Sequence, residues 1–382
     1  MQIQKSLLIT LAFCGASMLS AQTWLDDSFT SGSSGTNGDY IASSGGRDAG
    51  TAGVQSPPNS AVWWGNGSTY GGGSTGTPVP GNNPIQYVPS SGIQFYSGLG
   101  ANGGGSAASD SVTANFTAPD HPDSIAVGDT LDVSFTFTMT GSISDDLTGI
   151  RFALSNSGST ASTSNQMVKN TGNGLSAGST GAPTSYSGYF VDFDPAATTN
   201  TGGPVVAIFN RAPSTANTEY IASTSTGKFN QLGYSTASST APGLTAGTSY
   251  TATLAITNNG SGKNTLVFGV APVGDTNPLD VLYSTTVTDT GVAGSNTGNG
   301  LTGTSAIPTQ SFANPIVDSF DTFTIGEHSG ETADLLVSNV DISIAPAAIP
   351  EPSTYAAILG VATLGFVLVR SRRQRRQQVI AS

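Results

Sequence analysis

The stretch Asp129–Gly141, DTLDVSFTFTMTG, decides the fold class of this chain. Its apolar residues occupy every second position: Leu131, Val133, Phe135, Phe137 and Met139. The positions between them carry Asp132, Ser134, Thr136 and Thr138. Successive side chains of a β-strand point to opposite faces of a sheet, so the alternation gives this strand one apolar and one polar face. The stretch therefore predicts a half-buried strand of an antiparallel sheet.

The same alternation recurs along the chain. Residues 248–272, TSYTATLAITNNGSGKNTLVFGVAP, predict a hairpin of two strands around an Asn/Gly turn. Further candidate strands, separated by Gly/Ser/Thr/Pro loops, are residues 23–29, 61–67, 149–158, 187–195, 204–212, 280–290, 320–328 and 335–344. No repeat of 20–50 residues is visible. We predict an all-β fold, an antiparallel β-sandwich of jelly-roll type over residues 22–345, with a division near residues 118–127 as the alternative.

The composition narrows the function classes. Only 9% of the 382 residues are charged, whereas 37% are hydrophobic, which is enough to bury a core. The net charge is −12, and five of the 12 basic residues lie close to the C-terminus: Arg370, Arg372, Arg373, Arg375 and Arg376. The region before them is strongly acidic and would repel a phosphate backbone, so nucleic acid is not an expected partner.

The N-terminus predicts a secretory signal peptide over residues 1–21. Lys5 precedes an apolar stretch from Leu7 to about Gly15, and small residues lie around Ala21, the expected cleavage position. The expected partner for export is the Sec translocon. The only cysteine, Cys14, lies inside this segment, where a lipoprotein acylation site is the alternative to an ordinary signal-peptide residue. After cleavage the chain has no thiol, which excludes a disulfide framework, a thiolate metal site and a cysteine nucleophile.

The C-terminal segment, residues 346–382, has three parts in a fixed order. Pro350, Glu351 and Pro352 come first, an apolar run over residues 355–369 follows, and the arginine cluster over residues 370–376 ends it. The run is shorter than the roughly 20 residues that span a bilayer, but flanking arginines can extend a short transmembrane helix. The arginines would then stay in the cytoplasm and the sandwich outside. A buried C-terminal helix of a soluble domain is the alternative.

This three-part order resembles the sorting signal of PEP-CTERM proteins. The resemblance covers about the last 30 residues. It implies a Gram-negative bacterium in which an exosortase recognises the tag while the chain is held transiently in the inner membrane. It further implies cleavage near Pro-Glu-Pro and delivery to the cell surface or to an extracellular exopolysaccharide matrix. The tag describes delivery and carries no catalytic chemistry.

The region between the two ends resembles concanavalin-like jelly-roll domains. The similar elements are the opening DDSF at residues 26–29, GIRFALSN at 149–156, the SYTATLAIT hairpin, and the closing FDTFTIG and ADLLVSNVDISI segments. Residues 191–195, VDFDP, resemble the metal-binding strand of legume lectins. Asp192 and Asp194 at alternate positions, followed by Asn200, are hard oxygen ligands that calcium prefers, so they form a candidate calcium site. The alternative is a polar strand face followed by a turn.

Trp63 and Trp64 form the candidate sugar contact, together with Tyr70. Adjacent residues of a strand point to opposite faces, so one tryptophan would fill the core while the other could stack on a sugar. A purely structural role for both rings is the alternative. The sequence does not distinguish which of the two faces outward.

Groups suited to catalysis are few. Glycosidases on such folds need two carboxylates across a sugar, and the only close glutamate pair, Glu327 and Glu331, falls in a turn. His121 and His328 show no ligand or triad spacing. We therefore expect a non-enzymatic surface or matrix protein, exopolysaccharide-associated or without any ligand. The alternative is a carbohydrate-active enzyme, a glycoside hydrolase or lyase on a concanavalin-like fold.

Overall fold

A computed structural model of the chain describes the strands, their nearest turns and one short helix, and the account below is confined to these residues. The described residues are 21–29, 32–34, 40–43, 62–66, 85–88, 90–95, 110–116, 122–143, 149–158, 186–196, 204–213, 229–236, 243–275, 282–291, 298–299, 316–327, 333–347, 360–370 and 372–373. The chain divides into a compact unit, Ala21–Ala345, and a second unit made of Met1–Ser20 and Pro346–Ser382.

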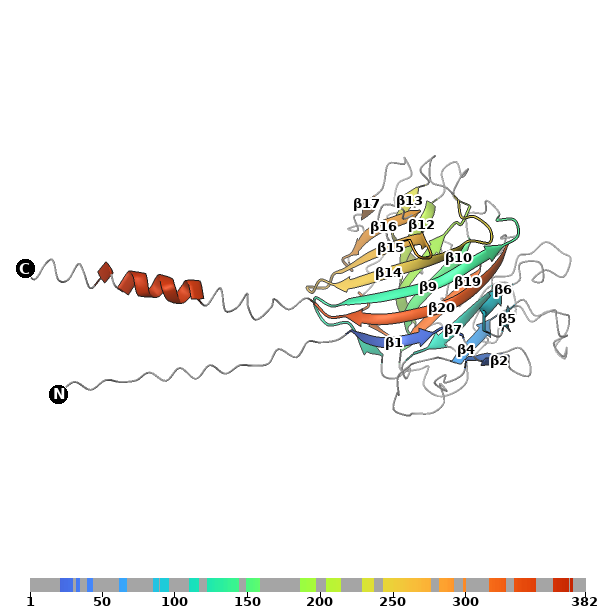
Figure 1. Cartoon of the computed structure of the whole chain (residues 1–382), viewed down its shortest axis with the longest axis horizontal. Helices are drawn as coiled ribbons and strands as arrows, with labels where there is room; N and C mark the ends of the chain where they lie inside the picture. The colour runs from blue at the N-terminus through green and yellow to red at the C-terminus, as the bar shows by residue number, and fades with distance from the viewer. Residues whose placement is uncertain are drawn as a thin grey trace, which may run out of the picture. The chain divides into compact units, whose positions relative to one another are not determined.

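Two nine-stranded antiparallel sheets make up the first unit (Figure 1). Sheet A has the order β17 (Gly298–Asn299), β16 (Tyr283–Asp289), β15 (Asn264–Pro272), β14 (Ser249–Asn258), β9 (Thr130–Thr140), β20 (Asp334–Ala345), β6 (Gly92–Phe95) and β5 (Ile85–Val88), and β1 (Gln22–Asp27) also pairs with β20. The predicted hairpin is confirmed as β14–β15, with Tyr250 opposite Pro272 and Asn258 opposite Asn264.

Sheet B lies against sheet A. Its order is β13 (Phe229–Thr236), β12 (Pro204–Arg211), β11 (Ser187–Phe193), β10 (Ile150–Asn156), β19 (Thr322–Glu327), β7 (Asp110–Asn115), β4 (Val62–Asn66), β3 (Tyr40–Ser43) and β2 (Gly32–Ser34). A two-stranded ladder joins β8 (Asp123–Ser124) to β18 (Ser319–Phe320). The antiparallel β-sandwich of jelly-roll type that the alternation predicted is confirmed.

The strands before residue 118 are more numerous than the sequence suggested, and they join both sheets. β7 pairs with β19, and β6 pairs with β20, although more than 200 residues separate the partners in the chain. Strands from both sides of residues 118–127 therefore belong to the same two sheets. Short segments such as β3 and β5 have only four residues each, which is too short for a period of two to be recognised.

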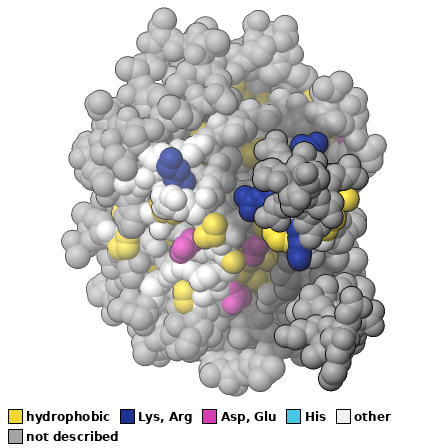
Figure 2. Space-filling view, turned by 90° about the vertical axis from the view of Figure 1, so that its left-hand side faces the viewer, with side chains coloured by type: hydrophobic (Ala, Val, Ile, Leu, Met, Phe, Trp, Pro, Cys, Tyr) yellow, Lys and Arg dark blue, Asp and Glu magenta, His cyan; other side chains and the backbone are white. Residues whose placement is uncertain are grey.

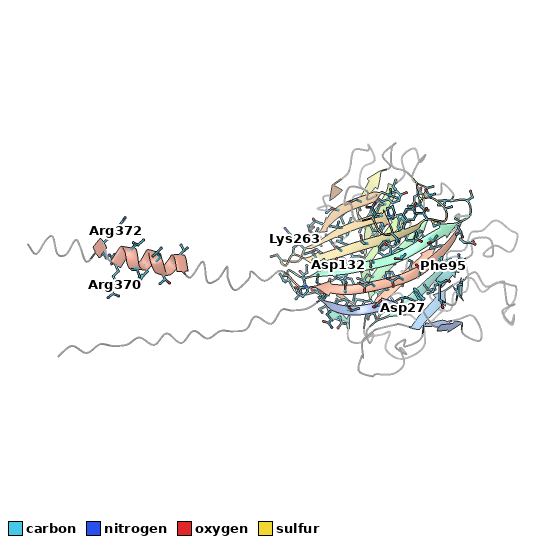
Figure 3. The ribbon with its side chains drawn as sticks, viewed as in Figure 1. Asp27, Phe95, Asp132, Lys263, Arg370 and Arg372 are labelled. Atoms are coloured by element: carbon cyan, nitrogen blue, oxygen red, sulfur yellow. The ribbon has the colours of Figure 1, made fainter. Side chains whose placement is uncertain are left out.

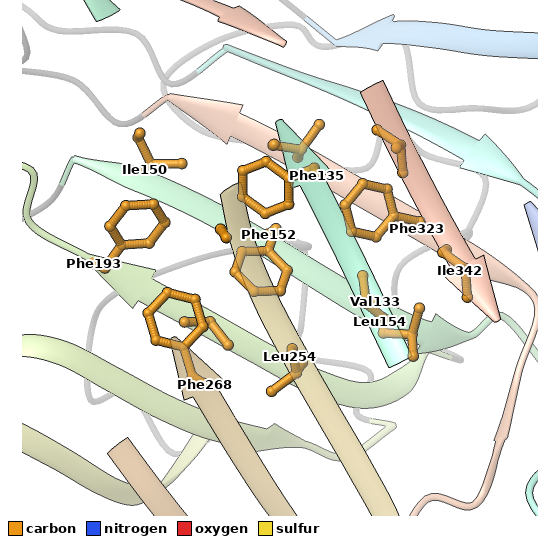
Figure 4. Close-up of a cluster of buried hydrophobic side chains, with 14 of the residues drawn as sticks. Val133, Phe135, Ile150, Phe152, Leu154, Phe193, Leu254, Phe268, Phe323 and Ile342 are labelled. Carbon is orange, nitrogen blue, oxygen red and sulfur yellow. The ribbon is translucent and has the colours of Figure 1, made fainter. Parts of the chain in front are cut away.

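An aromatic cluster between the sheets forms the centre of the core (Figure 4). Phe135 of β9 meets the edge of Phe152 of β10 with ring centroids 5.1 Å apart. Phe152 also packs against Phe268 of β15 and Phe323 of β19, at 5.9 and 6.2 Å. Edge-to-face and tilted ring pairs of this kind contribute about 0.5–1.5 kcal/mol beyond their area burial. The core therefore connects strands of both sheets through one side chain.

The outer face of sheet A has the polar character that Asp129–Gly141 predicted. On β9 the five apolar side chains are buried, while the residues between them are half-buried or exposed. Asp132 lies on this face (Figure 3). Burial, and then repulsion from Asp341, raise its pKa. Among the described residues visible on one end of the molecule, polar uncharged side chains and backbone predominate (Figure 2).

The C-terminal segment contains a helix over residues 360–370. All of its side chains are exposed, including Val361, Leu364 and Phe366, and Arg370 and Arg372 lie at its end (Figure 3). Within the residues described, no helix reaches the length and apolar character that a membrane crossing requires. Most of the predicted signal peptide, Pro350–Pro352, residues 355–359, Arg375 and Arg376 lie outside the described residues.

Truncation of Phe152 tests the core. We expect Phe152→Ala to lower the free energy of unfolding by about 3–5 kcal/mol, because the cavity would remove aromatic contacts to both sheets. Urea unfolding followed by tryptophan fluorescence measures the change. Val273→Ala, at a side chain that is 52% exposed, is the control and should change stability by less than about 0.5 kcal/mol. Equal effects of the two substitutions would contradict this assignment of the core.

Candidate functional site

The outer face of sheet B differs from that of sheet A, because its central strands are buried on both sides. Ile150, Phe152 and Leu154 of β10 point into the core. The residue that follows each of them, beginning with Arg151, therefore belongs to the outer face. All three of those residues, Arg151, Ala153 and Ser155, are nevertheless buried. The pattern continues on β11, where every residue from Gly188 to Phe193 is buried. A polar group on this face therefore lies in a place where water does not screen it.

An ion pair between adjacent strands is the main polar feature of this face. Arg151 of β10 lies directly opposite Asp192 of β11 in the ladder, and its Nε donates to Asp192 Oδ2 over 3.2 Å. The two residues are only 3% and 7% exposed. Asp192 Oδ1 is also buried and, among the described residues, accepts no hydrogen bond. Oδ1 is therefore an acceptor without a described donor.

The environment of Asp192 opposes its ionisation. Burial raises the pKa of this carboxyl to about 6, whereas the charge of Arg151 and its hydrogen bond act in the opposite direction. The neighbouring carboxylate of Asp194 adds to the increase. Desolvation is thus the larger effect, although a counter-charge lies within hydrogen-bonding distance.

Asp194 belongs to a turn that several backbone contacts fix. Its Oδ1 accepts a hydrogen bond from the Ala196 N–H over 2.9 Å, and its own N–H donates to the Val205 carbonyl. The Pro195 carbonyl accepts from the Leu244 N–H and from the Tyr283 hydroxyl. Gly149 allows this arrangement, because a Cβ at that position would lie 2.1 Å from Pro195 Cδ. The turn therefore sets the direction of the Asp194 carboxylate.

These contacts test the candidate calcium site. Calcium requires six to eight oxygen ligands, several of them from carboxylates. The structure instead gives Asp192 a guanidinium partner and uses Asp194 to cap a turn, and Asn200 lies outside the described residues. No group of three or more His, Cys, Asp or Glu side chains that could hold a metal occurs in the described part of the chain. The donor set at Asp192 and Asp194 does not fit calcium.

Aromatic side chains lie on the same outer face. Phe190 of β11 stacks on Phe209 of β12 with ring centroids 5.0 Å apart. Arg211 lies over the ring of Tyr186, 5.8 Å from its centroid, and donates from Nη1 to the Tyr186 carbonyl over 2.7 Å. The outer face of β10–β12 therefore combines aromatic rings with charged groups on rigid strands.

The ladder pairs the two candidate tryptophan positions with residues on different faces of sheet B. Trp63 is opposite Ala114, a core residue, whereas Trp64 is opposite Thr113. Thr113 shares its face with Thr324, and their hydroxyls are hydrogen-bonded over 2.9 Å. Thr324 in turn pairs with Ala153 on the outer face. Position 64 is thus paired with Thr113, a residue of the face that carries Arg151 and Asp192.

The remaining sequence-predicted groups are not brought to this face by any described contact. Glu327 is the last residue of β19, opposite Ile150 and Asp110 in the ladder. Tyr70, His121, His328 and Glu331 lie outside the described residues.

A buried polar network between the sheets was missed by the sequence analysis. Asp289 of β16 accepts hydrogen bonds from the Tyr189 hydroxyl over 3.0 Å and from the Asn210 side chain. Asn264 of β15 donates to the Tyr189 oxygen and to the Val317 carbonyl. Burial, and then the Asp289 charge, raise the pKa of Tyr189 well above its usual value. The signal for this network is the position of Asp289, which continues the buried alternation of Tyr283, Thr285 and Val287.

Comparison with solved structures finds carbohydrate-recognition proteins of low similarity. The potassium-bound Emp46p carbohydrate recognition domain is 10% identical, covers 75% of this chain and 89% of its own, and gives a TM-score of 0.33. The VIP36 exoplasmic/lumenal domain in its Ca²⁺/Man3GlcNAc-bound form is 12% identical, covers 77% of this chain and 87% of its own, and gives a TM-score of 0.36. Peanut lectin with a 9mer peptide is 12% identical, covers 74% of this chain and 97% of its own, and gives a TM-score of 0.32. No family model and no curated protein matches the sequence. At these values a shared ligand cannot be inferred, and the fold assignment depends on the strands themselves.

Asp321 provides a pH test of the buried polar groups. Burial raises its pKa to about 6, although the Ser157 N–H, the Ser157 hydroxyl and the Thr322 hydroxyl all donate to it. A folded-state pKa above the unfolded value means that the folded state binds more protons between these two pH values. The stabilisation is therefore complete at low pH and is lost as the pH rises through about 6.

We expect the parent chain to lose on the order of 2 kcal/mol more stability than Asp321→Asn when the pH rises from about 4 to about 7. Urea unfolding across this range measures the difference. Asp318→Asn, at an exposed aspartate nearby, is the control and should keep the parent's pH dependence. An unchanged pH slope in Asp321→Asn would contradict the assignment.

Proposed function

We propose that this chain is an exported, non-enzymatic protein of a bacterial cell surface or extracellular matrix that associates with exopolysaccharide through the outer face of sheet B. The observation that carries the proposal is the composition of the outer face of β10–β12. Phe190 stacks there on Phe209, which is half-buried, and the Arg151–Asp192 ion pair lies on the neighbouring strands. Recognition of polyhydroxylated ligands needs a few fixed polar groups among apolar and aromatic surfaces.

The positions of the carboxylates support a binding role over hydrolysis. A glycosidase needs one carboxylic acid and one carboxylate facing each other across the sugar. Asp192 instead lies on β11 and Asp194 in the turn that follows it, and Arg151 and the Ala196 N–H hold them in place. This arrangement positions hydrogen-bond acceptors without providing a nucleophile opposite an acid.

A carbohydrate-active enzyme is the rival reading, and one observation favours it. The pKa of Asp192 is raised to about 6, and a buried acid of this kind can act as a proton donor near neutral pH. Release of reducing sugar or of unsaturated product from polysaccharide, abolished by Asp192→Asn, would establish the enzyme and reject the binding role.

The two ends of the chain support export and sorting. The apolar N-terminal stretch precedes a unit that begins at Ala21, and an exposed apolar helix over residues 360–370 precedes Arg372 and Arg373. In the proposed order of events, the Sec translocon exports the chain, the C-terminal segment holds it in the inner membrane of a Gram-negative bacterium, and an exosortase acts at Pro350–Pro352. The unit Ala21–Ala345 contains every strand that is described.

Substitution of Trp64 tests the sugar-binding part. We expect Trp64→Ala to lower the affinity for the producing organism's own exopolysaccharide by about tenfold, or about 1.4 kcal/mol, because the indole ring would no longer bury apolar area against a sugar. Affinity electrophoresis in gels containing the polysaccharide measures it. Thr138→Ala, on the outer face of sheet A, is the control. Binding by Trp64→Ala equal to that of the parent would remove this role.

Substitution of the sorting motif tests delivery. We expect the double change Pro350→Ala and Pro352→Ala to leave the full-length chain in the inner membrane, because the processing protease would no longer recognise its site. Fractionation and immunoblotting of cells with and without the exosortase measure the location. Arrival of the altered chain at the surface at the parent's level would reject sorting through this motif.

A further inference from the structure

β11 and the turn after it contain the residue types of a calcium site, but their oxygen atoms contact protein groups. Asp192 lies on β11 and Asp194 follows two positions later in the turn, and two carboxylates at this spacing are hard oxygen ligands of the kind that calcium prefers. An ion bound there would need both carboxylates and at least one nearby carbonyl oxygen. Each of these three oxygen sources already has a partner from the protein.

Arg151 is the partner of the Asp192 carboxylate. Directly opposed residues of an antiparallel pair have Cβ atoms about 4.5–5.5 Å apart, so the guanidinium reaches Asp192 without leaving its own strand. The Nε to Oδ2 distance is 3.2 Å, and the side chains are 4% and 9% exposed. A divalent ion at Asp192 would lie within a few ångströms of a buried positive charge, where repulsion is weakly screened.

The turn after β11 supplies hydrogen-bond partners to the Asp194 carboxylate and the Pro195 carbonyl. The Ala196 N–H donates to Asp194 Oδ1, and the Pro195 carbonyl accepts two hydrogen bonds, from the Leu244 N–H and from the Tyr283 hydroxyl. Redirecting these oxygens to a metal would break contacts that join the turn to Leu244 and to Tyr283 of β16. The described oxygens of Asp194 and Pro195 therefore already have partners from the protein.

We infer that Arg151 is the resident cation of the β10–β11 pair: its guanidinium neutralises Asp192 in the place where a bound calcium ion would otherwise do so, and this face of sheet B keeps its structure without metal. Arg151 is accordingly a positioning residue that fixes the direction of the Asp192 carboxylate. Oδ2 is held by the guanidinium and Oδ1 is left as the acceptor. The inference concerns folding and does not depend on the proposed sugar binding.

A double-mutant cycle on the full chain tests this role. Arg151→Met keeps the bulk of the side chain but leaves a buried carboxylate without its counter-charge, so the melting temperature at neutral pH should fall by at least about 5 °C. Adding Asp192→Asn removes the unpaired buried charge and should restore more than about half of the lost melting temperature. Arg211→Met is the matched control, because Arg211 donates to a carbonyl on the same face, and Asp192→Asn should bring it no recovery.

Calcium dependence supplies the second readout, which needs only the parent chain. Its melting temperature in excess calcium and in excess chelator should agree within about 1 °C, because an ion that bound the folded state alone would raise it. A rise of several degrees with calcium that Asp192→Asn abolishes would overturn the inference. Recovery of Arg211→Met by Asp192→Asn equal to that of Arg151→Met would overturn it as well. If the parent chain does not bind exopolysaccharide but its variants melt as expected here, only the proposed function is rejected.

Discussion

The contact between Phe135 and Phe152 fixes more than the core. Because β-strand side chains alternate, burying Phe152 against β9 obliges Arg151 to point to the outer face of sheet B. On β11 the burial of Phe193 against Phe137 and Phe268 obliges Asp192 to point to the same outer face. A slip of one residue in either strand would bring a charge into the aromatic cluster. The candidate site is therefore positioned by the hydrophobic effect acting on its neighbours in sequence.

This coupling explains which parts of the molecule the sequence could predict. The alternation in Asp129–Gly141 and in the β14–β15 hairpin identified the sandwich, because strands with one exposed face show a clear period of two. On β11 the segment Tyr189–Phe193 is almost continuously apolar, as in strands that are buried on both sides. That pattern located a strand but concealed the second buried face. Asp192 falls on β11 and Asp194 in the turn after it, and their partners were not foreseen.

Partners were missed because they depend on register between distant segments. Arg151 and Asp192 are 41 residues apart, and Asp289 and Tyr189 are 100 residues apart. Only the ladder determines that these groups meet, because the connection between β10 and β11, residues 157–186, is too long for its turn type to set the register. Asp289 itself was predictable as an inward residue from YSTTVTD. Its neutral donors Tyr189 and Asn210 come from the opposite sheet, which the sequence could not assign.

The pairing of the first and last strands relates the fold to the proposed processing. Gln22 of β1 is opposite Ile344 of β20, so the strand that follows the expected signal-peptide cleavage lies beside the strand that precedes the sorting segment. β20 also pairs with β9 along nearly its whole length, which makes it an inner strand of sheet A. Sheet A can therefore close only when residues up to Ala345 are available. Because all described ladders lie between Gln22 and Ala345, cleavage after residue 21 and near residue 350 would remove no strand pairing. A sandwich held by packing and by buried polar contacts can therefore lose both terminal segments and keep every described strand pairing.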